Sequence, residues 1–72
     1  MSEFLALRPQ QLIRALKKAG FSIERTKGSH IQMKRGNLLV TIPYHNRDLS
    51  RSTLQSILRQ SRLSIGELKT LL

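Results

Sequence analysis

Residues 21–42 read FSIERTKGSHIQMKRGNLLVTI, and two glycine-containing breaks divide this stretch into three short segments. Apolar and polar side chains alternate in the first two segments, which is typical of half-buried strands. The breaks, KGS and RGN, have the residue types of tight turns. We therefore expect a meander of three antiparallel strands over residues 21–26, 30–34 and 38–42.

The period of two decides which side chains share a face of the second strand. Ile31 and Met33 fall on one face. The opposite face then carries His30, Gln32 and Lys34. The histidine is therefore expected to point away from the apolar side of the sheet.

The same alternation predicts two faces for the first strand. One face is expected to carry Phe21, Ile23 and, if the period continues, Arg25. The other face is expected to carry Ser22, Glu24 and Thr26.

Helical patterns flank the strands. From Arg8 to Gly20 apolar residues recur at helical spacing, with Pro9 suited to the first turn. A second apolar stripe over 50–61 follows a Ser50 cap, and a capping-box spacing near residue 64 predicts a short C-terminal helix. The order predicts an α+β, α-β-β-β-α fold, with a three-stranded antiparallel sheet, helices on one of its faces and His30 on the other.

Length and composition narrow the class of protein. The chain has 72 residues, which predicts one domain over 1–72, and no cysteine, so disulfides and thiolate metal sites are excluded. No apolar run approaches the roughly 20 residues of a membrane span, and no secretion signal opens the sequence, so we expect a cytoplasmic protein. A net charge of +9 predicts a polyanionic partner, nucleic acid or an acidic protein, although charge can also serve solubility alone.

The common catalytic and cofactor motifs are absent from the sequence. Its four carboxylates stand at 3, 24, 48 and 67, and neither His30 nor His45 has the spacing of a zinc or two-metal site. There is no nucleophile elbow and no phosphate-binding loop. We therefore expect no metal and no small-molecule cofactor, and His45 is more readily explained as a residue that fixes its loop, with a role as a second acid left open.

A histidine among cations suits the cleavage of RNA. Imidazole exchanges protons near neutral pH, and the ribose 2′-hydroxyl is a built-in nucleophile, so a base beside a stabilised phosphate can cleave the backbone without a metal. Gly28 and Ser29 suit either a phosphate contact or a turn. From these residues alone, a surface histidine at the start of a strand is more often incidental than catalytic, so His30 needs further support.

The sequence resembles the HicA family of toxins, small mRNA-cleaving proteins of toxin-antitoxin modules. The resemblance covers most of the chain and rests on LIRALKKAGF at 12–21, KGSH at 27–30, VTIPYH at 40–45 and LSRSTLQSILRQSRLS at 49–64. It implies a double-stranded-RNA-binding-domain-like fold, metal-independent endoribonuclease activity with His30 as the catalytic residue, and a HicB-type antitoxin as partner. Three places depart from the family pattern: Ser52 where a glycine is common, Ile31 where a second histidine often occurs, and Arg8-Pro9 where small or capping residues are expected at the start of the first helix.

Three hypotheses follow for the function. In the first, the protein is an mRNA-cleaving toxin, with His30 as general base or as base and acid in turn. The residues expected to hold RNA around it are Lys27, Gly28, Ser29, Lys34 and Arg35. In the second, it is a non-catalytic module that binds double-stranded RNA or DNA through charge alone. In the third, compatible with the first, its main task is to pair with an acidic antitoxin.

Overall fold

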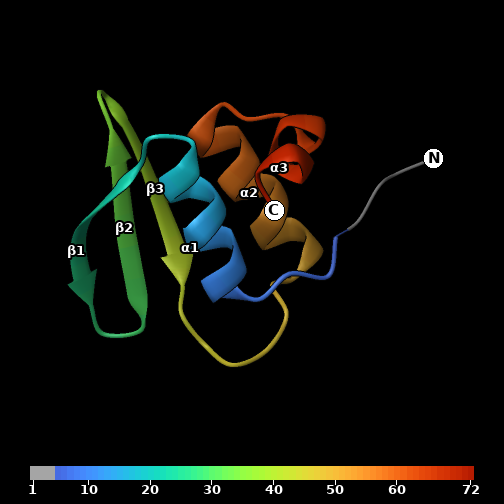
Figure 1. Cartoon of the computed structure of the whole chain (residues 1–72). Helices are drawn as coiled ribbons and strands as arrows, with labels where there is room; N and C mark the ends of the chain where they lie inside the picture. Colours follow the sequence, from blue (N-terminus) through green and yellow to red (C-terminus); the bar gives the residue numbers. More distant parts are fainter. Residues whose placement is uncertain (1–4) are drawn as a thin grey trace.

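An antiparallel sheet of three strands forms one layer of the molecule, and helices cover one of its faces (Figure 1). The computed structural model describes residues 5–72. The strands follow each other in space as they do in the sequence, in the order β1-β2-β3. This confirms the expected α+β fold, including the C-terminal helix. The elements are α1 (Pro9–Lys18), β1 (Ser22–Lys27), β2 (His30–Arg35), β3 (Leu38–Pro43), α2 (Arg51–Ser61) and α3 (Ile65–Leu71).

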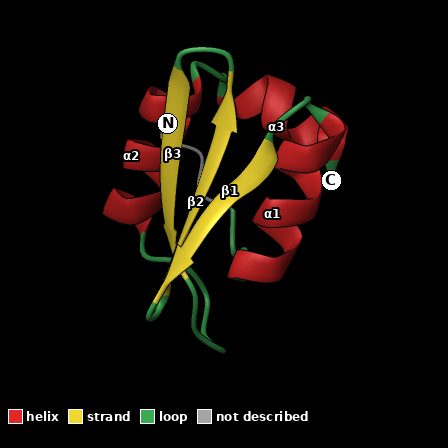
Figure 2. Cartoon of the chain, turned by 90° about the vertical axis from the view of Figure 1, so that its left-hand side faces the viewer, coloured by secondary structure: helices red, strands yellow, loops and turns green. Residues whose placement is uncertain are grey.

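The core lies between the sheet and the helices. Met33, Val40 and Ile42 on the sheet lose all contact with solvent. Leu12 and Leu16 are equally buried, because residues four apart fall on one side of α1. Figure 2 shows the sheet from its other face, which no helix covers. The rest of the buried apolar set is Leu7, Ile13, Ala15, Phe21, Ile31, Leu49, Leu54, Ile57 and Leu68.

Two tight hairpins set the register of the sheet. Lys27 pairs with His30, which leaves Gly28 and Ser29 as a two-residue loop. The φ of Gly28 is +58°, and the φ of Ser29 is not positive. This is the φ pattern of a type II′ turn. Gly36, with a φ of +59°, begins the equivalent loop between β2 and β3. Both turns match the right-handed twist of the strands that they join.

A β-bulge in β1 changes the faces expected for that strand. Ile23 pairs with Met33, but the next paired residue is Arg25, opposite Gln32, so Glu24 is the extra residue. Arg25 therefore shares the uncovered face with Gln32, and the expectation that it lies on the apolar side is wrong. Thr26 pairs with Ile31 and lies on the helix-facing side, which is also the reverse of the expectation. A strict period of two cannot continue through a bulge.

The two edges of the sheet differ in whether their outward backbone amides have hydrogen-bond partners. On the β3 edge, the Thr41 amide donates to Gln60 Oε1 of α2 at 2.9 Å, and Gln60 Nε2 in turn donates to Ser56 Oγ at 3.2 Å. Outward amides recur every second residue, and the next position, Pro43, has no N–H to present. On the opposite edge all six residues of β1 are exposed. One edge is thus closed by side chains and the other is open.

The ends of the helices are fixed by specific hydrogen bonds. At the start of α1 the Arg8 amide donates to Gln11 Oε1 at 2.9 Å, which compensates for a residue that is a poor N-cap. At α3 the predicted capping box is present: the Glu67 amide donates to Ser64 Oγ at 3.0 Å and the Ser64 amide to Glu67 Oε1 at 2.9 Å. The hydrogen bond from the Ser64 backbone also lowers the pKa of the Glu67 carboxyl. No helix within residues 5–72 has the length and apolar character needed to cross a bilayer.

Candidate nucleic-acid interface

The uncovered face of the sheet carries His30, as the alternation in β2 predicts. His30 is the first residue of this strand, is exposed, and lies opposite Lys27 on one side and Pro43 on the other. Directly paired residues of neighbouring strands present their side chains on the same face, so Lys27 flanks the imidazole. Within residues 5–72, the His30 ring makes no hydrogen bond or ion pair, so both of its nitrogens are available to a ligand.

The backbone around His30 is held firmly although its ring is not. The Tyr44 amide donates to the Ser29 carbonyl at 2.6 Å, which ties the β1–β2 turn to the end of β3. A Cβ atom built on Gly28 would meet no atom within 4 Å. The glycine is therefore required by its positive φ and not by crowding, and the space above the turn is open. This arrangement presents the imidazole at a fixed place on an accessible surface.

The predicted RNA-binding residues do not all lie together. Lys27, Gly28 and Ser29 form the turn beside His30. Lys34 lies on the same face at the other end of β2, four residues and thus about 13 Å along the strand. Both groups of residues could contact successive parts of one extended polyanion.

Arg35 faces the other way. Its Nη1 donates to the Ala19 carbonyl at 2.7 Å, and its guanidinium carbon lies 4.8 Å from the centroid of the Phe21 ring. It thereby joins the end of β2 to the end of α1 on the side of the sheet opposite His30. The structure does not bring Arg35 to the imidazole, and its contacts are those of a structural clamp.

The second histidine has an internal partner. His45 is half-buried, and its Nδ1 accepts the Arg47 amide at 3.1 Å. The neutral ring must then carry its proton on Nε2. This contact fixes the loop between β3 and α2, as expected for His45. Within residues 5–72, no three histidine or carboxylate side chains gather in a way that could hold a metal ion.

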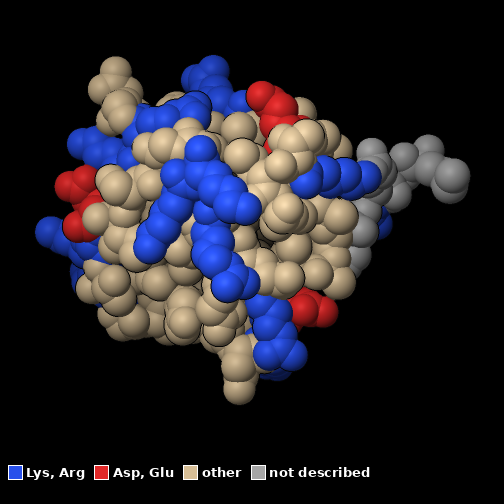
Figure 3. All heavy atoms as spheres, in the orientation of Figure 1, with Lys and Arg blue, Asp and Glu red and all other residues tan. Residues whose placement is uncertain are grey.

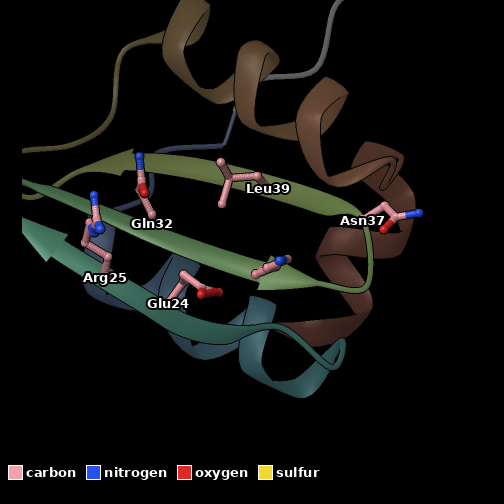
Figure 4. Close-up of a pocket in the computed structure, with 6 residues that line it drawn as sticks. Glu24, Arg25, Gln32, Asn37 and Leu39 are labelled. Atoms are coloured by element: carbon pink, nitrogen blue, oxygen red, sulfur yellow. The ribbon is translucent and has the colours of Figure 1, made fainter.

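Sequence reasoning missed a groove on the same face as His30. It has a volume of about 460 Å³ and draws residues from all three strands and from the β2–β3 turn (Figure 4). Period two predicts the faces of Gln32 and Lys34, but Glu24 and Arg25 enter the groove together only because of the bulge in β1. No signal in the sequence marks that bulge. The residues that line the groove are Glu24, Arg25, Gln32, Lys34, Asn37 and Leu39.

Positive charge extends beyond the face that carries His30. In Figure 3, Lys and Arg side chains gather over α1, on a side of the molecule next to the sheet. The exposed cations of this helix are Arg14, Lys17 and Lys18. With a net charge of +9, the whole protein attracts polyanions. On the uncovered face of the sheet, a polyanion held in this way would lie against His30.

Comparison with known proteins gives one family. The family model described as HicA toxin of bacterial toxin-antitoxin matches residues 9–63, which include α1, the whole sheet and α2. The matched range also includes His30 and all six residues of the groove. A search of curated proteins returns no significant match.

Proposed function

The chain belongs to the HicA family of toxins of bacterial toxin-antitoxin systems, and from that premise we propose that it is an endoribonuclease that cleaves mRNA with His30 as its catalytic residue. One observation carries the proposal: the exposed imidazole of His30 has no partner within residues 5–72 and stands beside Lys27 on the uncovered face of a strongly cationic protein. His45, by contrast, has an internal role, because its Nδ1 accepts the Arg47 amide.

In the proposed reaction, a neutral ring nitrogen of His30 takes the proton of a ribose 2′-hydroxyl. The O2′ atom attacks the adjacent phosphorus, the bond from phosphorus to O5′ breaks, and the departing O5′ takes up a proton. The products are a 2′,3′-cyclic phosphate and a 5′-hydroxyl end. A positioned base of this kind contributes about 10² to 10⁴-fold in rate.

The cations on the same face have a defined task in this reaction. Negative charge builds up on the phosphate oxygens during the attack, and in this proposal it is stabilised by Lys27, which pairs directly with His30 across the two strands. The proton that the departing O5′ takes up can come from the His30 imidazolium itself, from water or from another titrating group. DNA lacks the 2′-hydroxyl and is expected to remain intact.

Family membership indicates an antitoxin partner, and we propose that this partner is a HicB-type protein that covers the His30 face. An acidic surface on the antitoxin would match the cations there and exclude RNA from the imidazole at the same time. The complex would therefore be inactive for two reasons, charge neutralisation and steric exclusion.

The proposal is tested by incubating purified protein with RNA and mapping the new ends. The parent is expected to produce cyclic phosphate and 5′-hydroxyl ends, with or without EDTA, and His30→Ala to reduce the rate at least 100-fold. His45→Ala is the matched control, because it removes the other histidine and should leave a measurable cleavage rate. Circular dichroism of each variant establishes that it is folded.

Two results would overturn the assignment. If His30→Ala cleaves RNA as fast as the parent, His30 is not catalytic. If the parent shifts RNA in a gel but leaves every strand intact at all concentrations, the protein is a binding module and not a nuclease.

A further inference from the structure

We propose that the groove on the uncovered face is a base-binding pocket that selects the nucleotide next to the cleaved bond, with Glu24 as the residue that reads the base and guanine as the preferred base. The inference rests on the proposed function, because it takes RNA to be the polyanion that crosses this face. It assigns a role to Glu24, Arg25, Gln32, Asn37 and Leu39, none of which takes part in the proposed chemistry.

The first argument is position. Gln32 lines the groove and is two residues from His30 on the same face of β2, which corresponds to about 7 Å along the strand. That separation is on the scale of one extended nucleotide. A ribose placed at the imidazole therefore puts a neighbouring base over the groove.

The second argument is the state of the side chains that line the groove. Within residues 5–72, none of its polar side chains makes a hydrogen bond or ion pair with another residue of the protein. Arg35, by contrast, spends its guanidinium on the Ala19 carbonyl, and Asp48 lies 3.9 Å from the Arg8 guanidinium. The groove thus presents donors and acceptors that no internal contact uses.

The third argument is the apolar wall. Leu39 on β3 is 47% exposed, although it is a large aliphatic residue on a face that is otherwise mostly polar. In Figure 4 it lies between Gln32 and Asn37. A base buries its flat apolar face against a leucine while its edge reaches polar side chains at the rim. A phosphate alone would gain nothing from Leu39.

Glu24 is the informative residue because its charge has the wrong sign for the backbone of RNA. A carboxylate in a groove that binds nucleic acid repels phosphate, so it must be compensated by a contact that a carboxylate alone makes well. The bulge turns Glu24 and Arg25 toward the same face, side by side. A carboxylate next to a cation matches a base edge that presents donors and acceptors side by side.

Guanine has the edge that fits best. Its N1–H and N2–H groups are adjacent donors that can both bond to one carboxylate, and its O6 is an acceptor within reach of a cation. Uracil presents one donor between two carbonyl oxygens, which a carboxylate repels. Adenine and cytosine each present one amino group beside an acceptor nitrogen and should bind between these extremes.

The test measures binding without cleavage. The probes are hexanucleotides in which every residue is 2′-O-methylated, with uridine throughout except for G, A, C or U at the third position. They have no 2′-hydroxyl beside a phosphate, so the parent cannot cut them. Fluorescence anisotropy gives the affinity for each. We expect the parent to bind the G oligonucleotide about tenfold more tightly than the all-U one. Leu39→Ala should weaken binding of all four.

Glu24→Gln is the diagnostic variant, and Glu67→Gln is its control. Both remove one negative charge and should raise overall affinity, but only Glu24 lies in the groove, and a glutamine at 67 can still cap α3. Glu24→Gln is expected to reduce the ratio of G to U affinity to about one, while Glu67→Gln should keep the ratio of the parent.

The outcomes separate this inference from the proposed function. Equal affinities of the parent for all four oligonucleotides, or an unchanged G to U ratio in Glu24→Gln, would overturn the base pocket even if RNA is cleaved. A base preference that depends on Glu24 would support the pocket even if natural RNA stays intact, in which case only the nuclease proposal fails.

Discussion

Lys34 and Arg35 are neighbours of the same charge with different environments. Lys34 lies on the uncovered face and lines the groove. Arg35 lies on the opposite side, where it bonds the end of α1 and stacks over Phe21. The sequence predicts the face of Lys34 from the period of two, but it gives no sign that a carbonyl at the end of a helix will hold Arg35.

Alanine substitutions at these two positions should therefore affect different properties, stability at Arg35 and RNA binding at Lys34. Arg35→Ala loses a charged hydrogen bond and a cation–π contact, and we expect the free energy of unfolding to fall by about 1 to 2 kcal/mol. Lys34→Ala should change the free energy of unfolding by no more than about 0.5 kcal/mol. It should also reduce the slope of log K for RNA binding against log salt concentration by about 1, the loss of one phosphate contact. Urea unfolding and binding titrations over a range of salt concentrations measure both quantities. Similar effects of the two substitutions would contradict this division of roles.

At the scale of elements, the two hairpins are close to a matched pair. Each has a glycine at the first loop position, with φ of +58° at Gly28 and +59° at Gly36, and neither glycine has an atom within 4 Å of a built Cβ. An alanine at either place meets only backbone strain. The hairpins differ in what they carry, because only the first presents His30.

This similarity gives a controlled experiment on the active surface. Gly28→Ala and Gly36→Ala should each reduce the free energy of unfolding by about 1 to 2 kcal/mol. Gly28→Ala should slow RNA cleavage more than Gly36→Ala, because it displaces the imidazole from its place beside Lys27, whereas Gly36 lies next to Asn37 at the far end of the groove. Rates are compared at a temperature where both variants are fully folded. An equal loss of rate in both would show that stability, and not the geometry of the turn, controls activity.

The contrast between strands explains how much of the fold sequence alone predicts. Ile31 and Met33 are buried, and a buried face fixes which residues of β2 point where, so the placement of His30 is predictable. All of β1 is exposed, and its bulge at Glu24 leaves no mark in the hydrophobic pattern. The groove depends on that bulge, so the part of the site formed by Glu24 and Arg25 could not be found before the strands were paired.

At the scale of the whole molecule, the positive net charge governs how the protein approaches its partners. A net charge of +9 on 72 residues creates a field that acts before any specific contact forms. Cations lie over α1 as well as on the sheet (Figure 3). Such a field accelerates encounters with any polyanion, whether it is RNA or an acidic antitoxin.

We accordingly expect association with an acidic antitoxin to slow steeply as salt rises. The rate constant should fall by at least tenfold between about 10 and 300 mM salt, while the dissociation rate changes less, because salt screens the approach more than the docked contacts. Stopped-flow fluorescence resolves the two rates. An association rate that does not respond to salt would mean that contacts other than charge guide the partners together.

The unequal borders of the sheet limit how copies of this protein can join. Backbone pairing between molecules needs unspent N–H and C=O groups in a row, and β3 has lost this capacity to Gln60 and Pro43. Among the strands of residues 5–72, only β1 keeps such a row along a free edge. Two chains joined through β1 would each turn a blocked border outward, so growth by this route ends at a pair and does not continue into a fibre.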